Sequence, residues 1–502
     1  MKNVLTQILP LLLISGCTTL KPLDLPDETA SEPAQSPLWT ALETERPEDW
    51  FELLNHGSVA LEWRLRLIDS ATESIDLQTF LWMEDKTGLR IFRKILEAAD
   101  RGVRVRLLLD DTFTIGENDL IFDIAQHPHI EIRIYNPFRR RYDSMVLREL
   151  MNLGEFSRLD HRMHNKVMVV DNRAMILGGR NLADEYFGHH DSGNFRDMEI
   201  LSAGGIVREI SQRFDGFWNS NWSFPAEQVF SRPPAEKDLA YLRTWLNEVT
   251  EGEWSESPAS QQQQQWICAA HSAIPGEATL LADESAQKNP ANGEELPDQL
   301  AKKLISLVDQ SIEELILVTA YLIPTPELEA AVARAEKRGV RVRILTNSLR
   351  SNNHTAAHSA YRSHVRRLIN HGADLHEVRA FAKDRSNYML MPVENKKLGL
   401  HAKLLLIDRE QTFIGSANLD PRSLRLNTEI GLLIQSPELN QHMRELLEID
   451  FNQRNAWHLE VTNSGDLVWV GDDILLDAQP ADSTFQRLED WFLSILPIAG
   501  EM

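Results

Sequence analysis

The sequence has few cysteines, an excess of acidic over basic residues, and few long apolar runs. Its 502 residues include only Cys17 and Cys268, so no disulfide framework is expected. The 75 Asp and Glu outnumber the 52 Lys and Arg, and the resulting formal charge of -23 opposes long-range attraction to nucleic acid or an anionic bilayer. Beyond the N-terminal segment, no stretch reaches the roughly 18 uninterrupted apolar residues that a spanning helix needs. An anionic substrate must therefore be held by a local basic pocket.

The N-terminus has the layout of a secretion signal. Lys2 precedes an apolar run that ends at Ile14, and small residues follow it. Cys17 comes directly after Ile14-Ser15-Gly16, a pattern that resembles the lipobox of bacterial lipoproteins, in which the cysteine carries the lipid anchor. We expect a signal peptide over 1–16 and a lipidated tether over 17–45. A buried structural Cys17 is the alternative. Thr18 in place of Asp favours the outer membrane, so the predicted location is its periplasmic face.

A long internal repeat organises the rest of the chain. Arg101-Gly-Val-Arg-Val-Arg106 recurs as Arg338-Gly-Val-Arg-Val-Arg343, which is an offset of 338 - 101 = 237. The same offset links further pairs: His164 and His401, Lys166 and Lys403, Asp171 and Asp408, Gly178 and Gly415, Asn181 and Asn418. A register kept over more than a hundred residues predicts two homologous halves.

The local pattern within each half is helix, strand, helix, strand. Helical apolar spacing is followed by strand-like runs, and Arg-Gly turns end the second helices. We predict an α/β fold in which each half is a mixed, largely parallel β-sheet flanked by helices. The predicted domains are 46–222 and 276–502, joined by a linker or hinge over 223–275 that contains a helix near Asp238 to Val249, a polyglutamine tract and a packed Cys268.

Two motifs carry the chemistry. His164-Asn-Lys166 and His401-Ala-Lys403 each place an imidazole and an ammonium two residues apart at the mouth of a strand, on the same face. Glycine turns that end in Asn181 and Asn418 follow at equal distance. Two His, two Lys and two Asn around one phosphate suffice for phosphodiester displacement without a metal or another cofactor, because one His can attack phosphorus while the other protonates the leaving oxygen. Surface or packed imidazole remains the alternative reading of any single histidine.

The paired H-x-K-x4-D motifs resemble the phospholipase D superfamily. Longer strings, including Arg162-Met-His-Asn-Lys166 and Gly415-Ser-Ala-Asn-Leu-Asp-Pro-Arg-Ser423, are similar to bacterial cardiolipin synthases of the C type. The resemblance implies two phospholipase D-like domains related by a pseudo-twofold axis, with the active site between them. It also implies a two-step reaction through a phosphohistidine, with His164 as nucleophile and His401 as general acid and then base.

The resemblance assigns roles to further residues. A carboxylate after each Asn is expected to orient a histidine, and the candidates are Asp197 and Glu429. Asp171 and Asp408 end their strands and are predicted to hold turns. Ser416 is a candidate contact for substrate, and so is the basic run Arg139, Arg140 and Arg141, although a solvated loop is as reasonable a reading.

The predicted function is phosphatidyl transfer of the cardiolipin synthase type. Phosphatidylglycerol or phosphatidylethanolamine is the expected substrate, membrane contact is expected through Cys17, and no nucleic acid partner is expected. A hydrolytic phospholipase D uses the same residues and stays an alternative, while a nuclease is disfavoured by the net charge. The C-terminal segment Phe485 to Pro497 is expected to pack on its own domain as an amphipathic helix, with a membrane surface as the second reading.

Overall fold

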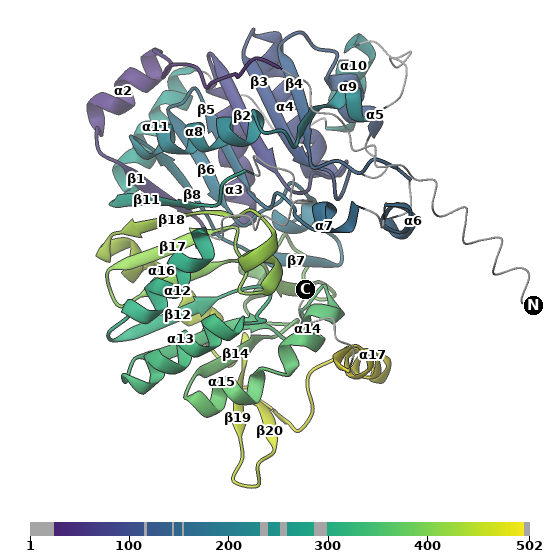
Figure 1. Cartoon of the computed structure of the whole chain (residues 1–502). Coiled ribbons are helices and arrows are strands. Elements are labelled where there is room, and N and C mark those ends of the chain that lie inside the picture. The colour runs from purple at the N-terminus through teal and green to yellow at the C-terminus, as the bar shows by residue number, and fades with distance from the viewer. Residues whose placement is uncertain are drawn as a thin grey trace, which may run out of the picture.

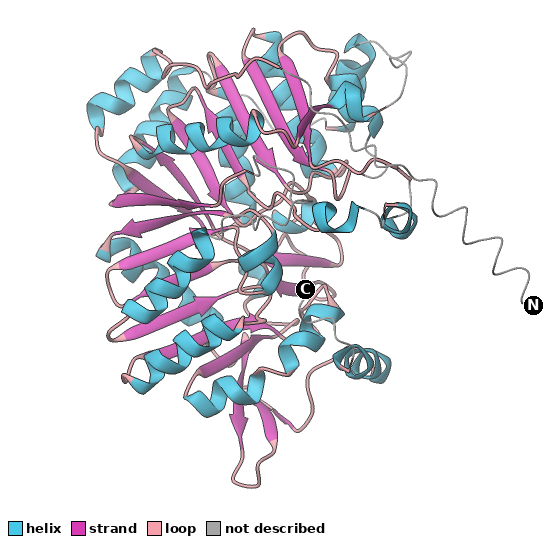
Figure 2. Cartoon of the chain, in the orientation of Figure 1, coloured by secondary structure: helices cyan, strands magenta, loops and turns pink. Residues whose placement is uncertain are grey.

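The computed structural model describes residues 25–114, 118–142, 145–152, 155–230, 239–250, 259–285 and 299–495. The signal peptide, Cys17 and the start of the tether therefore lie outside the described residues. Two α/β halves lie one above the other, each a sheet flanked by helices (Figures 1 and 2). Within the described part, no helix combines the length and apolar character needed to cross a membrane.

The N-terminal half is built on a nine-stranded sheet in the order β10-β1-β8-β6-β5-β2-β3-β4-β9. Its helices carry apolar stripes that pack on the sheet, as the amphipathic spacing predicted. The elements of this half are β1 (Trp50–Leu54), α3 (Gly57–Asp69), β2 (Ser74–Thr79), α4 (Lys86–Asp100), β3 (Arg104–Asp110), α5 (Asn118–Ile124), β4 (Ile130–Tyr135), α6 (Met145–Met151), α7 (Phe156–Leu159), β5 (Val167–Val170), β6 (Ala174–Gly178), β8 (Glu199–Ala203), α8 (Ile206–Trp218), β9 (Ser223–Pro225), α9 (Ala226–Val229) and β10 (Ile274–Pro275).

The C-terminal half repeats the plan in a ten-stranded sheet, ordered β11-β18-β17-β16-β12-β13-β14-β19-β20-β21. Its elements are β11 (Glu277–Ala282), α12 (Gln299–Gln310), β12 (Glu314–Val318), α13 (Pro326–Lys337), β13 (Arg341–Asn347), α14 (Thr355–Arg362), α15 (Val365–His371), β14 (Asp374–Val378), β16 (Leu404–Ile407), β17 (Gln411–Gly415), β18 (Ile430–Gln435), α16 (Pro437–Phe451), β19 (Ala456–Val461), β20 (Leu467–Val470), β21 (Leu475–Leu476) and α17 (Thr484–Ser494). The predicted repeat of strand, helix and strand is therefore confirmed in both halves.

The sheets are mixed, but "largely parallel" was wrong. Parallel pairing in the N-terminal sheet is confined to β2, β3 and β4, and the C-terminal sheet matches this with β12, β13 and β14. The other neighbours in both sheets run antiparallel. The physical reason is the length of the connections: helices α4 and α13 allow parallel crossovers, whereas the strands after each His-x-Lys motif are joined by tight hairpins, which force antiparallel pairing.

An aspartate ends each motif strand in a left-handed turn. Asp171 has φ of 56° and Asp408 has φ of 51°. The carboxylate of Asp171 accepts the backbone N–H groups of Glu73 and Ser74 at 2.8 and 2.9 Å, and that of Asp408 accepts the equivalent groups at the start of β12. These contacts fix the motif strand to the central parallel strand, which is a structural role and not a place at the reaction centre.

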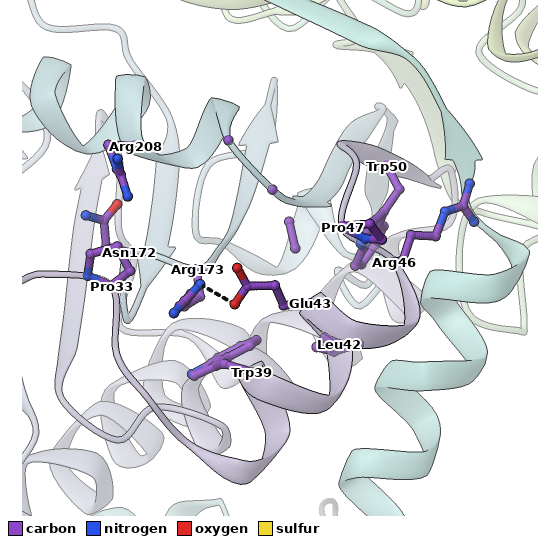
Figure 3. A pocket seen from close by; sticks show the side chains of 13 residues that line it. Pro33, Trp39, Leu42, Glu43, Arg46, Pro47, Trp50, Asn172, Arg173 and Arg208 are labelled. Carbon is purple, nitrogen blue, oxygen red and sulfur yellow. Dashed lines mark hydrogen bonds and ion pairs between the residues drawn. The ribbon is translucent and has the colours of Figure 1, made fainter.

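The residues expected to form a free tether are partly folded onto the N-terminal half. Ala34 and Trp39 are buried, and Trp39 Nε1 donates to Asp171 Oδ2 at 2.7 Å. Helix α2 (Pro37–Glu45) covers a pocket of about 320 Å³, across which Glu43 and Arg173 form an ion pair (Figure 3). The apolar residues of α2 find a partner surface, so the tether predicted over 17–45 is wrong for this described stretch.

The predicted linker over 223–275 is folded as well. Helix α10 (Leu239–Val249), which was expected, and α11 (Ala259–Ser272) contribute Leu242, Leu246 and Trp266 to the core of the N-terminal half. The glutamine tract lies in α11 because glutamine is a good helix former. Cys268 is exposed, not packed as predicted. The chain crosses between the halves at residue 276, directly after β10 pairs with β1.

The two halves share one apolar core. Side chains of β5 and β6 pack in the same cluster as those of β16, β17 and β18, and α8 and α16 add Ile210 and Met443. A small parallel sheet of β7 (Gly193–Arg196) and β15 (Lys397–Leu400) also joins the halves. The site between the halves is therefore held on both sides by continuous packing.

Candidate active site

The two motif histidines are fixed by backbone bonds that cross between the halves. His164 N donates to Thr428 O at 3.0 Å, and Thr428 N donates back to Arg162 O at 2.9 Å. His401 N donates to Arg196 O at 2.8 Å. Each histidine thus stands just before β5 or β16, and the residue opposite it directly precedes a buried carboxylate of the other half.

The carboxylates Asp197 and Glu429 reach across in the same way. His164 Nδ1 lies 3.0 Å from both carboxylate oxygens of Glu429, and His401 Nδ1 lies 2.7 Å from Asp197 Oδ2. Both carboxylates are fully buried, and the two imidazoles are nearly so. With Nδ1–H donating to the carboxylate, Nε2 is the nitrogen of each ring that stays available for chemistry. Each His–carboxylate dyad is built from both halves.

The lysines and asparagines complete the cluster. Lys166 Nζ donates to His164 O at 2.7 Å, and Lys403 Nζ lies 2.8 Å from His401 Nδ1. Asn181 Nδ2 donates to Tyr186 Oη at 2.8 Å. The buried side-chain oxygens of Asn181 and Asn418 have no hydrogen-bond partner among the described residues, so both amides have capacity for a ligand.

Burial, together with the charges of the two lysines, shifts the pKa values of the histidines and lysines in the cluster. Burial lowers the pKa of His401 to about 3, helped by the charge of Lys403, and burial together with both lysines holds the pKa of His164 well below its usual range. Burial also lowers the pKa of Lys166 to about 7 and that of Lys403 to about 8. The two rings are therefore neutral before a substrate binds, which is the form that can attack phosphorus or accept a proton.

The two carboxylates are not electrostatically equivalent. Burial raises the pKa of Glu429 to about 7, although Lys166 and Ser416 lower it in part. Burial would also raise the pKa of Asp197, but the hydrogen bond and charge of His401, followed by Lys403, lower it to about 2. Asp197 also accepts the Met198 N–H at 2.8 Å. The carboxylate of Asp197, which pairs with His401, is therefore firmly ionised. The carboxylate of Glu429, which pairs with His164, exchanges its proton near neutral pH.

The environments of Asp197 and Glu429 differ at one pair of equivalent positions in the repeat, Gly179 and Ser416. A Cβ on Gly179 would lie 2.4 Å from Asp197 Oδ1, so only glycine fits there. Its counterpart Ser416 donates from Oγ to Glu429 Oε2 at 2.5 Å and accepts from Ile430 N at 3.0 Å. These hydrogen bonds of Ser416 support the carboxylate that holds His164, and its predicted contact with substrate stays a prediction.

Two residues of the predicted arginine run make contacts outside this cluster. Arg141 forms an ion pair with Asp111 at 2.5 Å, and Arg140 NH1 donates to Met151 O at 3.3 Å. Arg139 is exposed. These contacts tie down the loop after β4, which is the solvated-loop reading of the run. A substrate role for the three arginines stays a prediction.

Two residues that the sequence reasoning missed hold the motif loops in place. Asp110 Oδ2 accepts the N–H of Met163 at 2.9 Å, and Asn347 Oδ1 accepts the N–H of Leu400 at 2.8 Å. Asp110 ends β3 and Asn347 ends β13, and both pairs keep the offset of 237. A polar residue recurring in register at the end of a central strand was the signal that could have revealed them.

The arrangement can support displacement at phosphorus. Two Nε2 atoms are ready to attack or to transfer protons, and two ammonium groups can balance the charge of a bound phosphodiester. The His and acidic residues of the described part that could hold a metal ion are Asp374, His376 and His458, which lie on β14 and β19 and not in this cluster.

Comparisons with known proteins agree on one family. The family described as "Cardiolipin synthase, PLD-like domain" matches residues 65–218 and 304–451. Cardiolipin synthase C of Escherichia coli K12 is 33% identical over 87% of this chain and 92% of that protein, and cardiolipin synthase B of the same strain is 26% identical over 79% of each. The phosphatidylserine synthase of Haemophilus influenzae has a TM-score of 0.53 at 16% identity, covering 82% of this chain and 89% of its own, which supports the fold. The chain belongs to the cardiolipin synthase family of phospholipase D-like proteins and is an enzyme of the phospholipase D superfamily.

Proposed function

We propose that this enzyme transfers a phosphatidyl group between hydroxyls of glycerol-type phospholipids, as a cardiolipin synthase does. The observation that carries the proposal is the pair of crossed dyads, His164 with Glu429 and His401 with Asp197, in one cluster with two buried lysines. Relatives named cardiolipin synthase cover most of the chain. Phosphatidylglycerol or phosphatidylethanolamine is the proposed donor.

The proposed reaction has two steps. In the first, His164 Nε2 attacks phosphorus, the bond from phosphorus to the headgroup oxygen breaks, and His401 donates the proton that this oxygen takes up. In the second, His401 removes a proton from the acceptor hydroxyl, whose oxygen attacks phosphorus and releases His164. Lys166 and Lys403 balance the charge on the phosphoryl oxygens in both steps.

The charge state of the cluster is consistent with this order. A phosphodiester that binds between the lysines places a negative charge beside them. This charge favours the protonated forms, so it raises the pKa values of the lysines and of a neighbouring imidazole. Substrate binding thus shifts His401 toward the protonated form that the first step needs. Water as acceptor gives a hydrolytic phospholipase D with the same residues, and this is the second candidate function.

Trapping decides which histidine is the nucleophile. A donor with an activated leaving group needs no general acid, so His401→Asn should accumulate a phosphatidyl adduct on His164, detected by acid-quenched mass spectrometry. His164→Asn should give no adduct, and His442→Asn, which changes an exposed histidine, should turn over normally. An adduct on His401 in the His164 variant would reverse the two roles.

The acceptor is identified by lipid mass spectrometry on purified protein with defined phospholipids. Cardiolipin formed from phosphatidylglycerol supports transfer, whereas phosphatidic acid as the main product supports hydrolysis. Release of nucleotides from DNA or RNA, without lipid turnover, would contradict the proposed substrate class altogether.

We also propose that the enzyme is a lipoprotein of the bacterial cell envelope, anchored through Cys17 on the periplasmic face of the outer membrane. The lipobox-like Ile14-Ser15-Gly16-Cys17 supports this anchor. Thr18 after the cysteine supports the outer membrane as its destination. Two or more attachment signals are needed for stable membrane binding by acyl chains, so the lipid supplied at Cys17 would add to any further contact of the folded domains.

A further inference from the structure

Helix α17 has its apolar side facing solvent. Its one buried residue is Asp490, whereas all its large apolar side chains except the half-buried Leu493 are between 51% and 74% exposed. These exposed residues are Phe485, Leu488, Trp491 and Phe492, followed by Ile495 at the C-cap. The helix packs on its own domain, against α14, as expected, but it does so through its polar side, so the apolar face stays exposed.

Polar contacts hold α17 in this orientation. Asp490 is fully buried and accepts hydrogen bonds from Ser359 Oγ at 3.0 Å and Gln479 Nε2 at 2.6 Å, and its Oδ1 lies 2.8 Å from His358 Nδ1. Arg362 NH1 also donates to Asp490 Oδ2 at 3.4 Å. A buried carboxylate with four partners is costly to pull out, so the helix cannot roll its apolar side inward without breaking this network. These contacts therefore keep the apolar face of α17 directed toward solvent.

The beginning of the helix lies near the C-terminal end of β13 and near β15, which leads to His401. Gln486 Nε2 donates to Leu349 O at 3.1 Å, just after the end of β13, and Asp482 forms ion pairs with Arg350 and with Lys397, the first residue of β15. Four residues after Lys397 is His401. Helix α6 of the other half exposes Leu147, Leu150 and Met151, and α6 and α17 project on the same side of the molecule (Figure 1).

We propose that the apolar face of α17, with α6 as a second contact, docks on the surface of a phospholipid bilayer and brings the active site between the halves close to it. The inference rests on the proposed lipid substrate. A bilayer is the occupant that fits, because Trp and Phe partition to the membrane interface and an 11-residue helix is too short to span it. Arg487 of the helix is exposed and suits anionic headgroups.

Vesicle binding tests the docking face. Full-length protein carrying Cys17→Ser, which has no lipid anchor, should sediment with vesicles of phosphatidylethanolamine and phosphatidylglycerol. Adding Leu488→Ser and Trp491→Ser should weaken this binding at least tenfold. The matched control is Ile312→Ser, which removes a 77%-exposed apolar side chain just before β12, outside the proposed docking face, and should leave binding unchanged.

Two outcomes would overturn the docking face. Binding of the double variant equal to that of the parent would do so, as would a parent protein that stays off vesicles but forms dimers which the double variant abolishes. Unfolding midpoints of all variants establish that they are folded. Turnover of a dispersed short-chain phospholipid by the parent tests the proposed function separately, so failure there and failure of docking are distinguishable.

A second inference stands on a different group. Asp374 and His376 lie two residues apart on β14, so they share a face, and His458 on β19 is the direct cross-strand partner of His376. Asp374 Oδ1 is 2.8 Å from His376 Nε2 and 3.1 Å from His458 Nε2. Three ligand atoms of the types that zinc prefers therefore converge, within 4.8 Å of one another.

An outer contact supports a metal role for this group. His458 Nδ1 lies 3.0 Å from Glu460 Oε1, and a carboxylate on the far ring nitrogen is the usual support of a metal-binding histidine. Asp374 and His458 are both partly exposed, so an ion can enter from solvent. We infer that Asp374, His376 and His458 bind a divalent transition-metal ion of the zinc type, with water completing its coordination, outside the cluster of His164 and His401.

Calorimetric titration of chelator-treated, full-length protein with zinc sulfate tests this site. One equivalent should bind, and His458→Asn should weaken that binding at least tenfold. The control is His364→Asn, because His364 pairs with Glu329 at 3.0 Å in a group without a second histidine. Absence of binding to the wild-type protein, or equal binding by the His458 variant, would refute the site.

Discussion

Replacing Lys166 by methionine should stabilise the fold while it abolishes activity. The Lys166 ammonium is buried close to Lys403, and burial lowers its pKa from 10.5 to about 7. At about 1.4 kcal/mol for each pKa unit, this difference of about 3.5 makes the charged form cost up to about 5 kcal/mol. Methionine has a similar length and no charge. We expect the free energy of unfolding to rise by about 2 kcal/mol or more, after loss of the hydrogen bond from Lys166 Nζ to His164 O.

The pH dependence gives the sharper test. Between pH 7 and 10.5 the unfolded chain binds a proton on Lys166 that the folded protein has released, so wild-type stability should rise with pH across this window. The variant lacks this contribution. Its advantage over the wild type should be largest below pH 7 and should vanish above about pH 10.5, by which both states of the wild type are deprotonated.

Urea unfolding of both proteins at pH 6 and pH 10 measures these differences. A control is Lys383→Met, which removes an exposed lysine paired with Asp472 and should not stabilise the protein at either pH. A Lys166 variant that is less stable at pH 6, or whose advantage does not change with pH, would refute the argument that burial of the Lys166 charge destabilises the fold.

Three further predictions follow from the same structure. Phosphatidyl transfer should be undiminished in excess chelator, because Lys166 and Lys403 supply the charge stabilisation; a requirement for one particular divalent ion in a turnover assay would contradict this. Cys17→Ser should leave the folded domains intact but reduce retention in outer-membrane fractions, as measured by fractionation; unchanged retention would place the anchor in α17. Asn347→Ala removes buried hydrogen bonds to both the N–H and the C=O of Leu400, so it should destabilise the protein by about 2–3 kcal/mol in urea and lower kcat more than KM; an unchanged kcat would show that His401 does not depend on this support.

Much of the fold could be predicted because the relevant signals are local. The Arg-Gly turns at Arg101 and Arg338 end helices α4 and α13, as predicted, and strands β3 and β13 follow these turns. Apolar periodicity and Arg-Gly turns determine such elements within a short window. The direction of the other strands depends on which hairpins form, and that is a tertiary property which the spacing of apolar residues does not contain.

The crossing of the dyads could not be predicted from the repeat. A sequence with two equivalent motifs is equally compatible with carboxylates that serve their own histidine or the other one. The pairing of β7 with β15 decides the matter, because it brings the residue before Asp197 against His401. The contacts of the Arg139 to Arg141 run could not be predicted for a related reason: Asp111, which engages Arg141, lies 30 residues away in sequence.

The crossed dyads also make the two halves depend on each other for catalysis. Glu429 and Asp197 are fully buried, and each has its histidine on the opposite half, so separating the halves would leave two carboxylates and two imidazoles without these partners. Gene duplication alone gives equal sites. Here one half has Gly179 where the other has Ser416 at the equivalent position, and this difference makes the carboxylate environments unequal. One dyad then keeps a firmly ionised Asp197 and the other a Glu429 whose pKa is about 7. A two-step transfer needs one group to attack while the other exchanges protons, and this inequality within a shared core lets one symmetric scaffold carry two distinct roles.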